Sequence, residues 1–250
     1  MAIPDLKQST STGNHSISSN HEFDNQSNCN PFESTQMDAR KPEVETGVSD
    51  ISYDSLLNPI HLQQDLSGGC GGKTWEAADI MIEYLLWKKS QSDTFFDGKR
   101  ILDLGSGTGL VGLAVASAFP GVQHMTLTDQ IPMMELMKQN ILLNGLERKV
   151  DAQILDWGTP LPESIMPLSD VILASDCVYL EIAFQPLVDT LVLLSTKETV
   201  IYLSYMKRRN ADKRFFQMLR KKFILKEIED DPKREVYSRK GLHLYLLTKK

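Results

Sequence analysis

The sequence predicts an α/β protein built on a seven-strand, doubly wound and mostly parallel sheet with an antiparallel last strand. From Lys99 onward, short apolar runs alternate with segments that have helical spacing. Because consecutive parallel strands are connected by right-handed crossover helices, this alternation is typical of a parallel sheet covered on both faces. The last two strand segments follow one another across residues 231–241, which predicts a closing hairpin with one antiparallel strand at the sheet edge.

The individual elements follow from local patterns. Short apolar runs typical of buried strands lie at 100–105, 124–129, 150–157, 170–176, 199–205, 223–230 and 242–248. Helical spacing or length is found at 110–119, 131–145, 184–195 and 212–222. Upstream, "SGGCGGKTWEAA" leads into a helix that ends near Lys89, with Thr74 as its expected cap. Residues 50–66 hold scattered apolar positions and predict a short strand pair before the core.

The chain divides into a tail and one globular domain. Residues 1–48 are rich in Ser, Asn, Gln, Thr, Pro and acidic residues, with few apolar positions and no period. Such a segment cannot bury enough apolar surface to offset its ordering entropy, so we expect it to be disordered. The folded domain is expected at 49–250, and no internal repeat is found.

Composition excludes several functional classes. The formal net charge of −6 argues against a general electrostatic grip on nucleic acid. The first residues lack the order of a secretory signal, and no apolar run reaches the ~18 residues of a membrane span. The three cysteines lie far apart without a CxxC pair, which argues against a metal site or a disulfide framework. We therefore expect a cytoplasmic, monomeric protein without a metal.

A glycine cluster in "ILDLGSGTGLVG" lies between a predicted strand and a predicted helix. Gly107, Gly109 and Gly112 satisfy G-x-G-x-x-G, the dinucleotide-binding pattern. Asp129 ends the next strand about 20 residues later, where an acid can bind ribose hydroxyls. On this motif alone, an NAD-dependent dehydrogenase stays open.

Two features favour S-adenosylmethionine over a dinucleotide. Asp103 lies two residues before Gly105, and a carboxylate there suits a ligand with an ammonium and a sulfonium better than a pyrophosphate. The sequence "ILDW" then offers Asp156 to an exocyclic amine and Trp157 as an aromatic face for a purine. S-adenosylmethionine carries adenine, ribose and a cationic tail without phosphate, and glycines allow the backbone to approach it closely.

These motifs together carry a family resemblance. Residues 70–250 resemble a class I, Rossmann-like methyltransferase with "LDLGSGTGL" as its first motif. The stretches "GGKTWEAA", "LDW" and "SDCVY" resemble the family 16 protein-lysine methyltransferases, whose marker is an acid-x-x-Tyr motif. The chain closely resembles the fungal elongation factor lysine methyltransferases, a likeness that extends to "SYMKRRNADKRFF".

The resemblance implies roles for individual residues. Asp103, Gly105 and Gly107 would hold the methionine end of the cofactor, and Asp129 would bind the ribose. The remaining cofactor-binding positions would be Asp156 and Trp157 at the adenine, Trp75 closing the site from the N-terminal side, and Ser175 at a strand end. Each of these side chains, taken alone, has a structural reading as a turn residue or a core aromatic.

The stretch "VILASDCVY" ends a predicted strand that neighbours the first strand of the sheet. Asp176 and Tyr179 would therefore lie where an acceptor amine arrives, and we interpret them as catalytic. Asp176 would orient a lysine whose reference pKa is ~10.4, raising that pKa while burial lowers it. The sequence leaves open which effect wins. The structural alternative is that Asp176 caps the following helix while Tyr179 packs in its first turn.

The basic stretch 207–222 also has two interpretations. It reads as an amphipathic helix with Phe215, Phe216 and Leu219 inward, or as a docking surface for an acidic protein or RNA. Arg208 and Arg209 are the basic residues expected to face substrate.

The resulting prediction is a protein-lysine N-methyltransferase that uses S-adenosylmethionine, with a translation elongation factor of the 1-alpha type as its protein partner through the resemblance. The alternatives are an RNA or small-molecule methyltransferase on the same fold, and a non-catalytic module that binds the cofactor and a partner.

Overall fold

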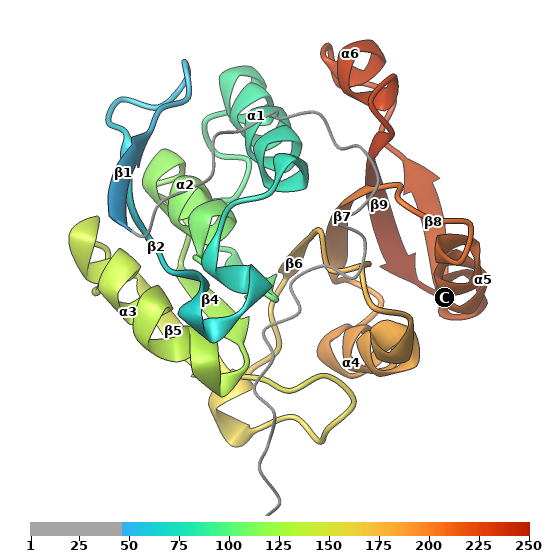
Figure 1. The fold of residues 1–250 in the computed structure, drawn as a ribbon. Coiled ribbons are helices and arrows are strands. Elements are labelled where there is room, and N and C mark those ends of the chain that lie inside the picture. The colour runs from blue at the N-terminus through green and yellow to red at the C-terminus, as the bar shows by residue number, and fades with distance from the viewer. Residues whose placement is uncertain (1–46) are drawn as a thin grey trace, which may run out of the picture.

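The computed structural model describes residues 47–250 (Figure 1). The predicted tail therefore lies outside the described residues, except for its last two positions. These two residues begin strand β1 (Gly47–Ile51), so the folded part starts slightly earlier than predicted. β1 pairs antiparallel with β2 (Ile60–Gln64), which confirms the predicted strand pair before the core.

One mixed sheet organises the domain. Its strand order is β5-β4-β3-β6-β7-β9-β8, and the strands from β5 to β7 run parallel. The order reverses between β3 and β6, which confirms the doubly wound sheet and the predicted adjacency of its first and fourth strands. The strands are β3 (Arg100–Leu104), β4 (His124–Asp129), β5 (Val150–Ile154), β6 (Val171–Ser175), β7 (Val200–Met206), β8 (Phe223–Glu227) and β9 (Leu242–Lys249).

The closing hairpin differs from the prediction in one respect. The last strand, β9, is antiparallel to both of its neighbours, as predicted, but it lies between β7 and β8 and not at the edge. β9 is the more apolar of the two segments, and its Leu242, Leu244 and Leu247 are buried. The inner place suits it because a buried strand needs hydrogen-bond partners on both sides of its backbone. β8 forms the edge and exposes Ile224 and Lys226.

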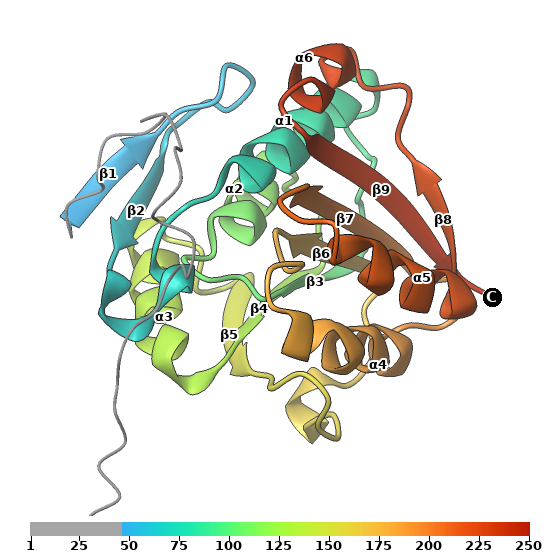
Figure 2. The same ribbon diagram turned by 45° about the vertical axis from the view of Figure 1, so that its right-hand side comes forward.

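Helices cover both faces of the sheet (Figure 2). Two apolar clusters result, one containing buried residues of α1, α2 and α3 and the other those of α4 and α5. The described helices are α1 (Glu76–Gln91), α2 (Leu110–Ala118), α3 (Met134–Leu143), α4 (Phe184–Leu194), α5 (Asp212–Lys222) and α6 (Arg234–Ser238). The segment between the last two strands was predicted as a plain connection, and α6 lies within it.

The entry into α1 also differs from the prediction. Thr74 does not cap the helix: Trp75 holds the capping position in an extended conformation, without a capping side-chain hydrogen bond. The Thr74 backbone N–H instead donates to the side chain of Gln64 on β2 (3.0 Å). This hydrogen bond connects the start of α1 to the first strand pair.

Candidate active site

The glycine turn between β3 and α2 is built from left-handed backbone conformations. Gly105, Gly107 and Gly109 have φ values of 66°, 55° and 83°, a region that side chains beyond glycine rarely adopt. The Ser106 hydroxyl closes the turn by donating to the Asp103 carbonyl oxygen (2.8 Å) and accepting from the Thr128 N–H (3.0 Å). The sequence cluster therefore forms a tight turn at the carboxyl edge of the sheet, as predicted.

The glycines also make room for the protein's own chain. A Cβ on Gly105 would lie 2.8 Å from the Trp157 ring and 3.2 Å from the Cys177 sulfur. A Cβ on Gly107 would lie 3.2 Å from the Gly71 carbonyl carbon and closer still to its oxygen. The segment before α1 thus packs on the turn at Gly107, and the Trp157 ring packs on the turn at Gly105.

Acidic side chains converge on the same edge. Asp103 is buried and accepts a hydrogen bond from the Gly112 N–H at 2.9 Å, close to the start of α2. Burial raises the pKa of Asp103, and the nearby charge of Asp129 adds to this rise. The hydrogen bond from Gly112 acts in the opposite direction, and the resulting pKa is about 7. Asp129 accepts the N–H groups of Gly107 (2.8 Å) and Gln130 (2.7 Å), and burial raises its pKa as well.

Asp156 completes this acidic group, accepting a hydrogen bond from the Gln130 side-chain amide at 3.0 Å. Asp129 and Asp156 border the glycine turn and are partly exposed, whereas Asp103 is buried beneath it, so the two outer carboxylates offer negative charge to a ligand. Such a lining suits a cationic ligand better than a phosphate.

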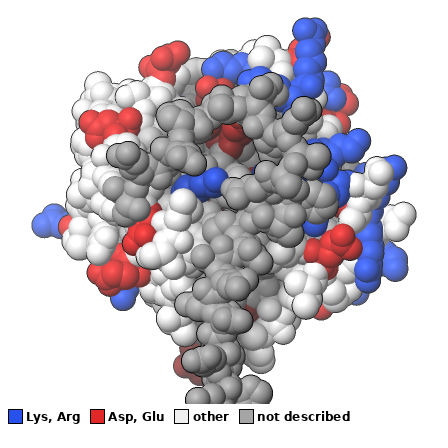
Figure 3. All heavy atoms as spheres, viewed as in Figure 1, with Lys and Arg blue, Asp and Glu red and all other residues white. Residues whose placement is uncertain are grey.

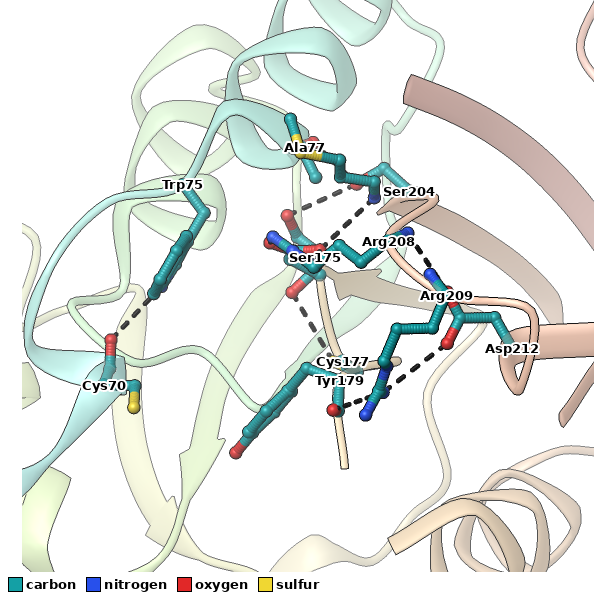
Figure 4. A network of polar contacts seen from close by, with 12 residues as sticks. Cys70, Trp75, Ala77, Ser175, Cys177, Tyr179, Ser204, Arg208, Arg209 and Asp212 are labelled. Atoms are coloured by element: carbon teal, nitrogen blue, oxygen red, sulfur yellow. Dashed lines mark hydrogen bonds and ion pairs between the residues drawn. The ribbon is translucent and has the colours of Figure 1, made fainter. Parts of the chain in front are cut away.

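The indole of Trp75 forms one wall beside the turn. Its Nε1 donates to the Cys70 carbonyl oxygen at 3.2 Å, which fixes the plane of the ring. The Lys73 ammonium lies 4.4 Å and the Arg208 guanidinium 5.6 Å from the ring centre. In Figure 4, Trp75, Tyr179 and Arg208 come from three different segments and point into a common space.

Asp176 follows β6 in a left-handed conformation (φ 55°), the one non-glycine residue with positive φ among residues 47–250. Its carboxylate accepts two hydrogen bonds from Arg208, at 2.8 and 2.6 Å, and lies 3.4 Å from the Met206 nitrogen. The interpretation of Asp176 as a helix cap is wrong, because the turn at Glu181–Ala183 and α4 both begin without a side-chain cap. Strain of this kind clusters at functional sites.

Tyr179 lies three residues further on and is 43% exposed. Burial and nearby negative groups raise the pKa of Tyr179 to about 12, so its hydroxyl is protonated at neutral pH. Its carbonyl oxygen accepts a hydrogen bond from Arg209, which also pairs with Asp212 at 3.5 Å. Arg209 and Asp212 therefore hold the loop that carries Tyr179.

The polar residues next to Asp176 and Tyr179 make hydrogen bonds that hold the local structure. The buried Cys177 thiol donates to the Leu104 carbonyl oxygen at 3.1 Å, and burial raises its pKa well above the usual value. The Ser204 hydroxyl on β7 donates to the Ala77 carbonyl oxygen (2.7 Å) and lies 3.3 Å from the Ser175 hydroxyl. Ser175 thus lies where the ends of β6 and β7 meet the start of α1 (Figure 4).

The structure brings the predicted residues to one edge of the sheet, around the reversal of strand order where open α/β sheets bind ligands. Sequence reasoning expected Arg208 to face substrate and missed its pairing with Asp176. The signal was present, because Arg208 comes two residues after the end of the strand beside β6.

Residues 212–222 of the basic stretch form helix α5 with Phe215, Phe216 and Leu219 buried, which confirms the amphipathic interpretation for this part. Figure 3 shows lysine and arginine side chains gathered over α5, at the right-hand edge of the view. A groove of about 360 Å³ runs beside this helix, and the cations that line it are Lys207, Arg209, Lys213 and Arg220. Docking of an acidic partner there stays a prediction.

Within residues 47–250, no group of three His, Cys, Asp or Glu side chains could hold a metal ion. In the same part of the chain, no helix is long and apolar enough to cross a membrane.

Comparison with known proteins identifies the family. The family model described as "Lysine methyltransferase" matches residues 56–222. The chain belongs to this family. That membership favours the methyltransferase interpretation over a dehydrogenase, and with the class I fold it implies S-adenosylmethionine as the methyl donor.

Curated relatives agree with this assignment. The protein-lysine N-methyltransferase EFM6 of Saccharomyces cerevisiae is 37% identical, over 84% of this chain and 94% of the yeast protein. The protein N-lysine methyltransferase METTL21A of Danio rerio is 35% identical, over 71% of this chain and 80% of its own length. EEF1A lysine methyltransferase 3 of Xenopus tropicalis is 31% identical, over 64% of this chain and 69% of its own length. This chain is therefore a protein-lysine N-methyltransferase.

Proposed function

We propose that this protein methylates a lysine side chain of a translation elongation factor of the 1-alpha type. The observation that carries the proposal is the position of Asp176 and Tyr179 at the end of β6, the strand adjacent to the glycine turn. The elongation factor is suggested by the relative named as an EEF1A lysine methyltransferase. A monomeric state and a cytoplasmic location stay predictions.

The residues around the glycine turn fit the methyl donor. S-adenosylmethionine, when bound, supplies an electrophilic methyl group on a positively charged sulfur. Asp129 and Asp156 border the turn with negative charge, which suits a positively charged ligand, and the buried Asp103 would hold the methionine end through the turn that its hydrogen bond from the Gly112 N–H supports. Asp129 would receive the ribose hydroxyls, and Asp156 with Trp157 the adenine.

The acceptor side would be formed by Asp176 and Tyr179, with Trp75 closing the cofactor site from the N-terminal side. The Tyr179 ring would line the passage of the lysine stem, and its protonated hydroxyl can donate to or accept from the amine. Asp176 would orient the amine by a charge-assisted hydrogen bond. Alignment of the two reacting atoms can contribute ~7–11 kcal/mol to catalysis, so we assign these residues chiefly to positioning.

The test is methyl transfer to purified elongation factor from cells that lack this protein, using radiolabelled S-adenosylmethionine and mapping of the labelled peptide. Asp176→Asn serves as the matched control, because asparagine tolerates the left-handed conformation while losing the charge. We expect one labelled lysine with the wild-type enzyme and labelling at least about 100-fold slower with the variant.

The competing functions are tested in the same experiment. RNA extracted from the same cells is offered as a second substrate, and a lysate without added elongation factor as a third. Labelled RNA, or labelling of a different protein with unlabelled elongation factor, would refute the proposed substrate. Absence of any transfer, with normal binding of the methyl donor, would favour the non-catalytic module.

A further inference from the structure

The acid at the acceptor site is already engaged by a cation of the same chain. Both carboxylate oxygens of Asp176 accept hydrogen bonds from Arg208, one from each terminal nitrogen of the guanidinium. The Asp176 side chain is 6% exposed and that of Arg208 28%. A bidentate pair of this burial is stronger and more directional than a surface ion pair.

Several groups surround the pair. Asp212 on α5 accepts a hydrogen bond from the Arg208 backbone N–H, and Glu76 on α1 lies close enough to act on the guanidinium. Burial lowers the pKa of Arg208, but the hydrogen bond and charge of Asp176 outweigh this and raise it overall, so Arg208 stays charged. Cys177 and Tyr179 are protonated at neutral pH. Other charged groups around the site are Lys73, Arg209 and Asp129, and Asp103 is only partly ionised because its pKa is about 7.

Methyl transfer requires a substrate lysine that has lost its proton. The reference pKa of a lysine amine is ~10.4, and a lone carboxylate within ~4–6 Å raises that pKa further. An unpaired Asp176 would therefore bind the ammonium form well and hold it in the state that cannot attack. A carboxylate paired with a guanidinium presents no net charge, so it can still accept a hydrogen bond without this penalty.

We propose that Arg208 is a positioning residue for methyl transfer, which neutralises Asp176 so that the acceptor site admits the substrate lysine as the free amine. The proton leaves the ammonium for solvent, and the nitrogen lone pair then forms the new bond to the methyl carbon. The electron pair of the broken carbon–sulfur bond returns to the sulfur, which loses its positive charge. This inference rests on the proposed function of the acceptor site.

The test separates charge from geometry. Arg208→Gln removes the charge, whereas Arg208→Lys keeps it and loses the bidentate fork. The double variant Asp176→Asn with Arg208→Gln restores a neutral site. Arg239→Gln, an exposed arginine that follows α6 and lies outside the basic stretch, is the matched control.

The first readout is the pH dependence of kcat, which reports ionisation in the enzyme–substrate complex. In Arg208→Gln, we expect the acidic limb of the kcat profile to move to higher pH by about one unit. The kcat of this variant should then be roughly tenfold lower near pH 7.5 and recover at alkaline pH. Arg208→Lys and the double variant should keep the wild-type position of the limb, whatever their rates. Arg239→Gln should match the wild type.

The second readout does not require turnover. Calorimetry of lysine-peptide binding, with the demethylated cofactor product bound and in buffers of different ionisation enthalpy, counts the protons released on binding. We expect fewer protons released with Arg208→Gln than with the wild type at the same alkaline pH.

The outcomes are decisive in both directions. A uniform rate loss in Arg208→Gln with an unmoved limb and unchanged proton release would make the pair purely structural and overturn the inference. An equal limb shift in Arg208→Lys would do the same. If the wild type fails to methylate elongation factor but methylates another protein, the proposed substrate fails, and the same variants are compared on the protein that is methylated.

Discussion

Replacing Gly107 with alanine would test how closely the segment before α1 packs on the glycine turn. Gly107 has a φ of 55°, and an added Cβ would lie 3.2 Å from the carbonyl carbon and Cα of Gly71. Those atoms are backbone and cannot rotate away, so the segment that carries Trp75 must shift. The substitution therefore strains both the local conformation and a tertiary contact.

The magnitude divides into two parts. A side chain in the left-handed region costs about 1–2 kcal/mol. Overpacking against fixed neighbours adds about 1–3 kcal/mol. Gly98→Ala is the matched control, because Gly98 has a φ of 68° and its added Cβ would meet nothing within 4 Å. The difference between the two variants isolates the contact with Gly71.

The assays are thermal unfolding and calorimetric titration with S-adenosylmethionine. For a protein of this size, each kcal/mol lowers Tm by about 2–4 °C, so Gly107→Ala should melt several degrees below Gly98→Ala. Displacing Trp75 should also weaken cofactor binding about tenfold or more, equivalent to about 1.4 kcal/mol, while Gly98→Ala binds normally. Equal Tm values with wild-type affinity in both variants would refute the close-packing argument.

Three further predictions concern charge, catalysis and packing. Because the pKa of Asp103 rises from 3.8 to about 7 on folding, the folded state alone holds this proton between those pH values. Its contribution to stability therefore falls as pH rises through that window, by at most about 1.4 kcal/mol per unit, and Asp103→Asn should flatten this part of the Tm profile. Asp176→Asn should keep its affinity for S-adenosylmethionine and lose at least about 100-fold in kcat, measured by single-turnover transfer; near-normal kcat would remove Asp176 from the mechanism. Ser204→Ala removes the hydroxyl that donates to the Ala77 carbonyl oxygen and should cost about 0.5–1.5 kcal/mol in urea unfolding; no loss would show that this hydrogen bond does not contribute to stability.

Much of the fold follows from local patterns. Apolar runs such as Val171–Ser175 and helical periods such as Asp212–Lys222 recur at short range, so their elements were predicted nearly to the residue. The errors lie where long-range contacts decide. The inner position of β9 depends on pairing with β7, about 40 residues away in the chain. Thr74 does not cap α1, and its backbone N–H instead donates to the Gln64 side chain on β2.

By itself, the sequence determined the glycine turn, the acids at the strand ends and their common edge, because parallel strands with crossover helices place successive carboxyl ends together. Which of these side chains meet across that edge depends on tertiary packing. Asp176 and Arg208 lie on separate loops, and their pairing depends on the register of β6 with β7 and on two side-chain conformations. No local pattern specifies that geometry, because it arises only when distant parts of the chain pack against each other.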